Sequence, residues 1–595
     1  MRKQSLMIRQ LKSKKIRYIL TGIPFVIYFL YLAFLNRYHI HYLEQNQLFI
    51  WSLDFLKEQF SLPGGLPLYS GSFFTQFFYS SWLGAFIYTL NAFAVFILSF
   101  YIFKKHNLEN IVLSFVPVWL LAILQSSELF TFGQAVGFLL LLSYFALYVK
   151  ISKSRSRYYF FFAGWPLFYY LTGGFSISVV LLCILHESLF RKEKKSYIII
   201  IFYIITGVLV PYLSAHLIFY IQPDKVFTYP VIYEFHSIFL YALILSFIWT
   251  PLILLASFLI YKAKSFKNRL LIWSITNVLA GMVIIVLMAF IVYKRAYNKM
   301  ADMMLGVDHY VQQAEWSNVL KISDRYPGYN TLVIYYTNLA LYKSGKLMDR
   351  MFHYPQIGSQ GLRLKWQRNL NLFFGGEVFS QLAYNNESIH WAFEALVAKG
   401  MNPRSLKKLA IGCIVNGNYD IARKYLSLLN GTLFYRKWAQ KHIRYLSDPD
   451  LMEKDHELSQ YLDLLVISNF FSEVNGLNLQ DLLQNHPENK MAYEYLLASL
   501  LLDRNLDGFV DVVQNLRYYG YKTMPLHIEE ALIFYDFYEN RNMVPDGYSF
   551  RQENINRFND YARAYTTYQS DRKIAAYELR KKYGNTYWYY LQFLR

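Results

Sequence analysis

Three acidic residues stand in polar stretches between long apolar runs of this 595-residue chain. Glu44 and Asp54 lie within residues 37–81, and Glu128 lies within residues 125–131. A carboxylate at the rim of a membrane can act as a general base toward an acceptor, or hold a divalent cation against a diphosphate. Glu128 is the most distinctive, because its stretch is short, lies between apolar runs and contains no Lys or Arg.

Three cationic or titratable residues lie in the same kinds of stretch. Arg37 and His41 begin the segment 37–81, and Lys225 lies in a further polar segment at 216–235. Such side chains hold phosphate groups by charge-assisted hydrogen bonds, so we expect them to bind the phosphate of a lipid-linked donor. A simpler interpretation competes for every one of these residues, since segments in water carry polar side chains whatever their function.

The elements that must position these residues are membrane spans. A hydrocarbon core of about 30 Å needs about 20 apolar residues in a helix, and the apolar runs before about residue 293 satisfy this. Two spans are expected in 158–190, with a turn at Gly173-Gly174, because a single span would put its two basic ends on opposite faces. We expect about nine spans: about 18–36, 82–103, two in 110–149, two in 158–190, 197–219, 236–261 and 270–293.

The basic residues set the expected orientation. About 21 Lys and Arg fall on one side of these spans and about three on the other, and basic loops stay in the cytoplasm. The N-terminus is then cytoplasmic, and the segments 37–81, 125–131 and 216–235 lie outside with the C-terminal half, which is periplasmic if the membrane is a bacterial inner membrane. The basic residues at Lys294 and Arg295 oppose this orientation.

The formal net charge of +20 does not indicate nucleic-acid binding. Much of the excess lies at the N-terminus and in short inner loops, where membrane lipids and insertion explain it, and no nucleic-acid-binding motif accompanies it. The two cysteines, Cys183 and Cys413, provide neither a disulfide framework nor a zinc site. We predict no metal site, and a divalent cation as cofactor stays an open question.

The expected fold class is all-α, with a transmembrane helix bundle at 1–299 and a soluble helical-repeat domain at 300–595. Three segments of the second domain share one pattern: a helix with a small residue, a polar turn and a second amphipathic helix. The small residues include Ala340, Ala410 and Ala498. This pattern resembles degenerate tetratricopeptide repeats, whose small residues let paired helices pack closely.

Two longer motifs resemble an uncharacterised bacterial family of polytopic membrane proteins. They are PGGLPLYSGSFFTQFFYSSWLGAFIYTL at 63–90 and GGEVFSQLAYNNESIHWAFEA at 375–395. The resemblance runs along the whole chain and implies a membrane location, but it brings no established activity.

The architecture has a broader similarity to the GT-C class of membrane glycosyltransferases. In that class a large outer loop with surface helices and an acidic residue follows the first span, and a second functional loop lies between spans 7 and 8. The resemblance implies a polyprenyl-phosphate-linked sugar as donor, Glu44 or Asp54 as base or metal ligand, and Glu128 as second acid. The chain departs from the class because 37–81 contains no adjacent Asp-Glu or Asp-x-Asp pair.

Three functions remain open at this point. The first is a glycosyltransferase that moves a sugar or oligosaccharide to a protein or glycan acceptor bound by residues 300–595. The second is a non-enzymatic envelope scaffold, in which the spans anchor a protein-binding repeat domain. The third is a transporter or flippase, which is weakened by the scarcity of charges within the spans and by the absence of duplicated halves.

Overall fold

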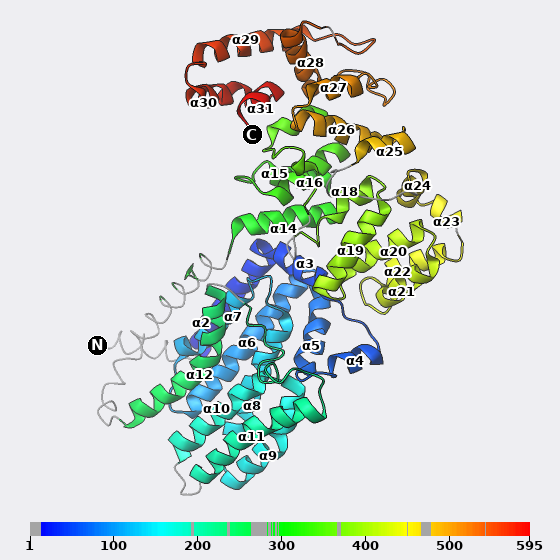
Figure 1. The fold of residues 1–595 in the computed structure, drawn as a ribbon. Helices are drawn as coiled ribbons and strands as arrows, with labels where there is room; N and C mark the ends of the chain where they lie inside the picture. The colour runs from blue at the N-terminus through cyan, green and yellow to red at the C-terminus, as the bar shows by residue number, and fades with distance from the viewer. Residues whose placement is uncertain are drawn as a thin grey trace. The chain divides into compact units, whose positions relative to one another are not determined.

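The computed structural model describes residues 14–191, 196–234, 238–262, 297–365, 371–448, 450–465, 478–541 and 543–594, with isolated positions between 283 and 294. Within these residues the regular elements are helices, with one isolated bridge between Ile357 and Ser359 and no strand, so the all-α prediction is confirmed. The chain divides into two compact units (Figure 1). The first is Met1–Asn298 with Gly431–Phe434, and the second is Lys299–Asn430 with Tyr435–Arg595.

The first unit is a bundle of apolar helices. Its elements are α2 (Lys14–Leu30), the π-helix η1 (Tyr31–Leu35), α3 (Arg37–Gln45), α4 (Leu53–Gln59), α5 (Gly65–Thr75), the 3₁₀ helix η2 (Gln76–Tyr79), α6 (Ser81–Lys105), α7 (Ile111–Leu124), α8 (Phe132–Lys150), α9 (Ser154–Thr172), α10 (Phe175–His186), the π-helix η3 (Glu187–Arg191), α11 (Ser196–Leu217) and α12 (Ile238–Lys262). The expected interruptions between α7 and α8 and between α9 and α10 are both present.

The helices α6, α8, α11 and α12 are long and apolar enough to cross a membrane, and the bent pair α2–η1 with α3 would make a fifth span. This identifies a multi-pass membrane protein. The helix α7 is apolar but has only 14 residues. The predicted ninth span, at about 270–293, lies almost entirely outside the described residues.

The helix α8 lies at the centre of the bundle. About 78% of its apolar window is buried inside the protein, against 28–44% for the other three long helices. It packs against α5, α6 and α10. A Cβ added to Gly71 of α5 would come within 2.4 Å of the Gly133 backbone in α8. The two helices can therefore approach this closely only because both positions are glycine.

The second unit is a succession of shorter helices. They are α14 (Lys299–Gln312), α15 (Trp316–Ser323), α16 (Thr331–Lys343), α17 (Leu347–Arg350), η5 (Met351–His353), η6 (Gln360–Leu362), α18 (Gly376–Gln381), α19 (Asn385–Lys399), α20 (Pro403–Val415), α21 (Tyr419–Asn430), α22 (Arg436–Tyr445), α23 (Asp450–Glu453), α24 (His456–Asp463), α25 (Leu479–Asn485), α26 (Lys490–Leu502), α27 (Leu506–Val513), α28 (Leu526–Glu539), α29 (Gln552–Tyr568), α30 (Arg572–Tyr583) and α31 (Tyr587–Phe593).

The three predicted repeat segments form helix pairs. The pairs are α16 with α17, α20 with α21 and α26 with α27, and Ala340, Ala410 and Ala498 are fully buried within them. In the second pair the start of α20 is fixed by a cap, because the Asn402 side chain accepts a hydrogen bond from the Ser405 N–H. The first pair departs from the pattern, since α17 has only four residues and continues as a 3₁₀ turn.

A buried ion pair joins the start of the second unit to its middle. The Arg404 guanidinium donates to both carboxylate oxygens of Asp308 at 2.9 Å, and Tyr336 donates to the same carboxylate at 2.9 Å. Bidentate geometry of this kind fixes direction as well as distance. The pair therefore sets how α14, α16 and α20 pack together.

Candidate functional site

The first polar segment, 37–81, begins with a sharp change of direction. The helix pair α2–η1 and α3 bends by 71° after Leu35. At the end of η1 the Asn36 N–H donates to the Tyr31 carbonyl at 3.0 Å, so the chain changes direction through a wide π-type turn. The helix α3 then buries most of its side chains, which indicates that it packs on the bundle rather than projecting into water.

Contacts hold this first segment against the end of α7. The His39 ring nitrogen Nε2 lies 3.0 Å from the Gln125 carbonyl oxygen. From the preceding helix α2, the Tyr28 hydroxyl donates to the Gln125 side-chain oxygen. Gln125 opens the segment 125–131, so the structure brings together the two segments in which the sequence places candidate acids.

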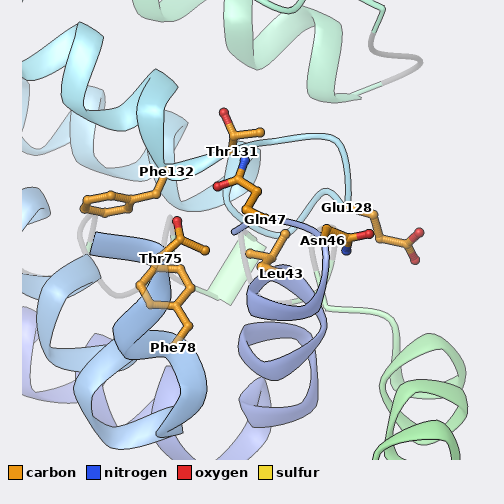
Figure 2. Close-up of a pocket in the computed structure, with 8 residues that line it drawn as sticks. All are labelled: Leu43, Asn46, Gln47, Thr75, Phe78, Glu128, Thr131 and Phe132. Carbon is orange, nitrogen blue, oxygen red and sulfur yellow. The ribbon is translucent and has the colours of Figure 1, made fainter. Parts of the chain in front are cut away.

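A small pocket lies where these two segments meet (Figure 2). The segment 37–81 contributes Leu43, Asn46 and Gln47 near the end of α3, and Thr75 and Phe78 from α5 and η2. The other lining residues are Glu128, Thr131 and Phe132, the last at the start of α8. Glu128 and Asn46 stand at one end, and the rings of Phe78 and Phe132 at the other. The cavity volume is about 30 Å³, which holds one or two water molecules. Sites for small ligands measure roughly 300–1,000 Å³, so the cavity is too small for a sugar.

The three candidate acids differ in their surroundings. Glu128 is exposed and lines the pocket. Glu44 is buried, accepts a hydrogen bond from the Gln45 side chain, and precedes the pocket residue Asn46 by two positions. Asp54 lies in the first turn of α4 with a side chain that is 97% exposed, 3.8 Å from the Lys57 amine. Of the three acids, only Glu128 is therefore among the residues that line the pocket.

The three candidate phosphate-binding residues also differ in exposure and in the segment that carries them. Arg37 is exposed, and its guanidinium carbon lies 4.5 Å above the Tyr38 ring. His41 is half-buried on the same helix, and Lys225 is exposed in the segment between α11 and α12. Across the described residues, no group of three or more His, Cys, Asp or Glu side chains could hold a metal ion.

Three of the segments between helices meet at one end of the bundle. The Gly64 N–H donates to the Tyr170 carbonyl at 3.1 Å, and the Gly174 N–H donates to the Tyr229 carbonyl at 2.7 Å. Gly173 has a φ of +60°, and a Cβ there would meet the Tyr229 carbonyl oxygen at 2.4 Å, so only glycine fits this turn. The segments 37–81 and 216–235 and the turn at 173–174 therefore meet on one face of the bundle.

A second polar cluster, inside the bundle, was not singled out from the sequence. Arg157 and Glu187 have no exposed side-chain surface. Arg157 Nε lies 2.7 Å from Glu187 Oε1 and Nη2 lies 3.2 Å from Oε2, while the Tyr148 hydroxyl donates to Oε1 at 2.8 Å. Tyr148 lies in turn 3.0 Å from the Tyr203 hydroxyl. The sequence places Glu187 next to a basic loop and therefore predicts a position near the membrane surface. It does not predict an ion pair with Arg157, which lies 30 positions earlier.

Two histidines lie next to this cluster. His106 Nε2 is 2.9 Å from His186 Nδ1, and His106 Nδ1 is 2.7 Å from the Ile102 carbonyl oxygen. A carbonyl can only accept, so His106 Nδ1 carries a proton and, in a neutral ring, its Nε2 accepts from His186. The two rings therefore tie the end of α6 to the end of α10.

Comparison with known proteins gives a family and no activity. No curated protein matches the chain, and no solved structure matches it. One family model, described as a family of unknown function (DUF6057), matches residues 12–594. The match covers both units, as did the resemblance carried by the two long motifs. This multi-pass membrane protein therefore belongs to the DUF6057 family of unknown function.

Proposed function

We propose that the protein is a GT-C-like glycosyltransferase of a bacterial inner membrane. It would transfer a sugar or oligosaccharide from a polyprenyl-phosphate carrier to a protein or glycan acceptor. The observation that carries the proposal is the fold of the first segment. Three helices, α3, α4 and α5, follow the first apolar helix, and the segment meets the turn that bears Glu128 at a pocket on the bundle.

The proposal includes a topology of nine spans with a cytoplasmic N-terminus. Support comes from the segments 37–81 and 216–235, which share one face of the bundle, and from the basic residues that flank the opposite ends of the helices. The C-terminal unit is then periplasmic, and its tetratricopeptide-like helix pairs hold the acceptor.

In this proposal Glu128 is the general base, because its carboxylate is exposed and lines the pocket. Arg37 and His41 lie on α3 and would hold the donor phosphate, together with Lys225 from the segment 216–235. The cavity of about 30 Å³ admits water only. Binding of the donor therefore requires α3 and the segment 125–131 to separate.

The experiment compares Glu128→Gln with Asp54→Asn in a strain that lacks the native copy. Sugar transfer is measured in isolated membranes from a radiolabelled polyprenyl-phosphate sugar to the envelope fraction, at matched protein levels. We expect Glu128→Gln to lower transfer by about 100-fold or more. Asp54→Asn is the control, because this side chain is exposed in α4 and does not line the pocket. Full transfer by Glu128→Gln would overturn the assignment of the base.

A second candidate function is a non-enzymatic envelope scaffold. The size of the cavity favours it, since a pocket that holds one or two waters requires no substrate. A scaffold predicts that Glu128→Gln restores the phenotype of the deletion strain completely, while a chain truncated after residue 298 does not. The glycosyltransferase predicts failure of both.

A further inference from the structure

Charge is strongly segregated within the second unit. Residues 403–430 and 435–447, which contain α20, α21 and α22, carry nine Lys and Arg and a single acid, Asp420. The remaining residues of 299–595 carry 25 Lys and Arg against 30 Asp and Glu. The three helices follow one another and pack side by side (Figure 1). One basic group of helices therefore stands within a unit that is otherwise acidic.

Part of this charge is neutralised inside the unit. Arg404 binds Asp308 at 2.9 Å and Lys408 binds Glu377 at 2.6 Å. Lys441 lies 2.7 Å from Asp455. Five of the other cations are exposed, and none of them forms an ion pair with an acid in the part of the chain that the structure describes. These five define the basic surface: Arg423, Lys424, Arg436, Lys437 and Arg444.

Apolar side chains stand among these cations. Ile421 on α21, within the second unit, is 45% exposed. On α22 the Trp438 ring lies 5.2 Å from the Lys407 amine. Trp438 is half-buried and Ile421 is exposed. Basic residues mixed with such apolar and aromatic side chains are typical of protein surfaces that rest on a membrane interface. A site for a soluble polyanion has no need of the apolar members.

We propose that the basic surface binds the headgroups of an anionic phospholipid bilayer. Its cations would pair with lipid phosphates, and Ile421 and Trp438 would enter the interfacial layer. A bilayer is always near this surface, because the first unit is embedded in a membrane and is covalently linked to the second unit. Binding of the basic surface to lipid is therefore effectively an intramolecular step. The proposal concerns binding alone and does not depend on the proposed enzymatic function.

The test uses the full chain in nanodiscs of phosphatidylcholine, with and without phosphatidylglycerol. Amide hydrogen exchange is followed in peptides that cover residues 419–446. Anionic lipid should slow their exchange by roughly tenfold, since each basic side chain near an anionic surface adds to the attraction. Raising the salt from 0.1 to 1 M should remove the protection, because the screening length falls from about 10 Å to about 3 Å.

A matched pair of variants separates this contact from general electrostatics. Lys424→Glu/Lys437→Glu reverses two charges of the basic surface, and Lys573→Glu/Lys582→Glu reverses two exposed lysines of α30. Only the first pair should abolish the protection. Equal exchange in both kinds of disc, or protection that survives Lys424→Glu/Lys437→Glu, would overturn the proposal. Protection by added heparin in phosphatidylcholine discs, with none from anionic lipid, would also overturn it and assign the surface to a soluble polyanion.

Discussion

Glu187→Gln provides the sharpest test of how the membrane unit is held together. Glu187 and Arg157 have no exposed side-chain surface, and removing one member of such a pair costs about 3–5 kcal/mol of stability because the other charge stays buried. Glutamine keeps one oxygen, which can still accept from Tyr148 and from Arg157 Nε in place of Oε1. Its amide group would face Arg157 Nη2, which now donates to Oε2 at 3.2 Å. We therefore expect a loss of about 3 kcal/mol, at the lower end of that range.

The assay is equilibrium unfolding of the purified chain in mixed micelles of rising SDS fraction, followed by circular dichroism. Arg157→Met/Glu187→Met removes both charges together, and Tyr148 keeps its contact with Tyr203 at 3.0 Å. The double variant should therefore be more stable than Glu187→Gln alone. A loss below about 0.5 kcal/mol for Glu187→Gln, the usual range of surface changes, or a double variant less stable than the single, would refute the reasoning.

Two further predictions concern close packing and pH. Gly71→Ala should lower the free energy of unfolding by about 1–3 kcal/mol in the same assay, because the new Cβ would meet the Gly133 backbone at 2.4 Å. Gly22→Ala is the control and should change stability by less than about 1 kcal/mol, because nothing lies within 4 Å of a Cβ there. Equal effects of the two substitutions would contradict the close approach of α5 and α8. Burial raises the pKa of Glu494 in the folded protein. The stability gained from the protonated carboxyl is therefore complete below the pKa of the unfolded chain, about 4.3, and is lost as pH rises through the folded pKa. Glu494→Gln should therefore raise the calorimetric melting temperature at pH 7 and leave it unchanged near pH 4, and an equal gain at both pH values would contradict this.

The helix layout of the membrane unit could be predicted from sequence because its signals are local. The run of apolar residues, the polar break at 125–131 and the glycine pair at 173–174 mark helix ends without reference to any distant residue. The Arg157–Glu187 pair carried no such signal. Its members are separated by 30 positions, and Arg157 reads as one more cation in a basic loop. Only the packing of α9 against α10 brings them together.

The sequence singled out one acid that lines the pocket, but it did not predict the surroundings of the others. Glu128 stood out because a lone acid in a short segment between apolar runs is unusual, and it is the acid that lines the pocket. The burial of Glu44 could not be foreseen, because it depends on the 71° bend before α3. No glycine or proline marks that bend in the sequence Tyr31–Arg37, so the usual signal for a break in a helix is missing.

The buried cluster also bears on the choice among functions. Ionisable residues inside a membrane often mark a transport pathway, and a relay requires a group that can exchange its partners. Here Glu187 Oε1 and Oε2 both accept hydrogen bonds, and Arg157 Nη1 donates to the Ile151 and Ser152 carbonyls at 3.2 and 2.9 Å. Such a cluster joins the end of α8 to α9 and α10. Sugar transfer by Arg157→Met/Glu187→Met should then be proportional to the amount of folded protein. Glu128→Gln, in contrast, should lose sugar transfer at an unchanged protein level.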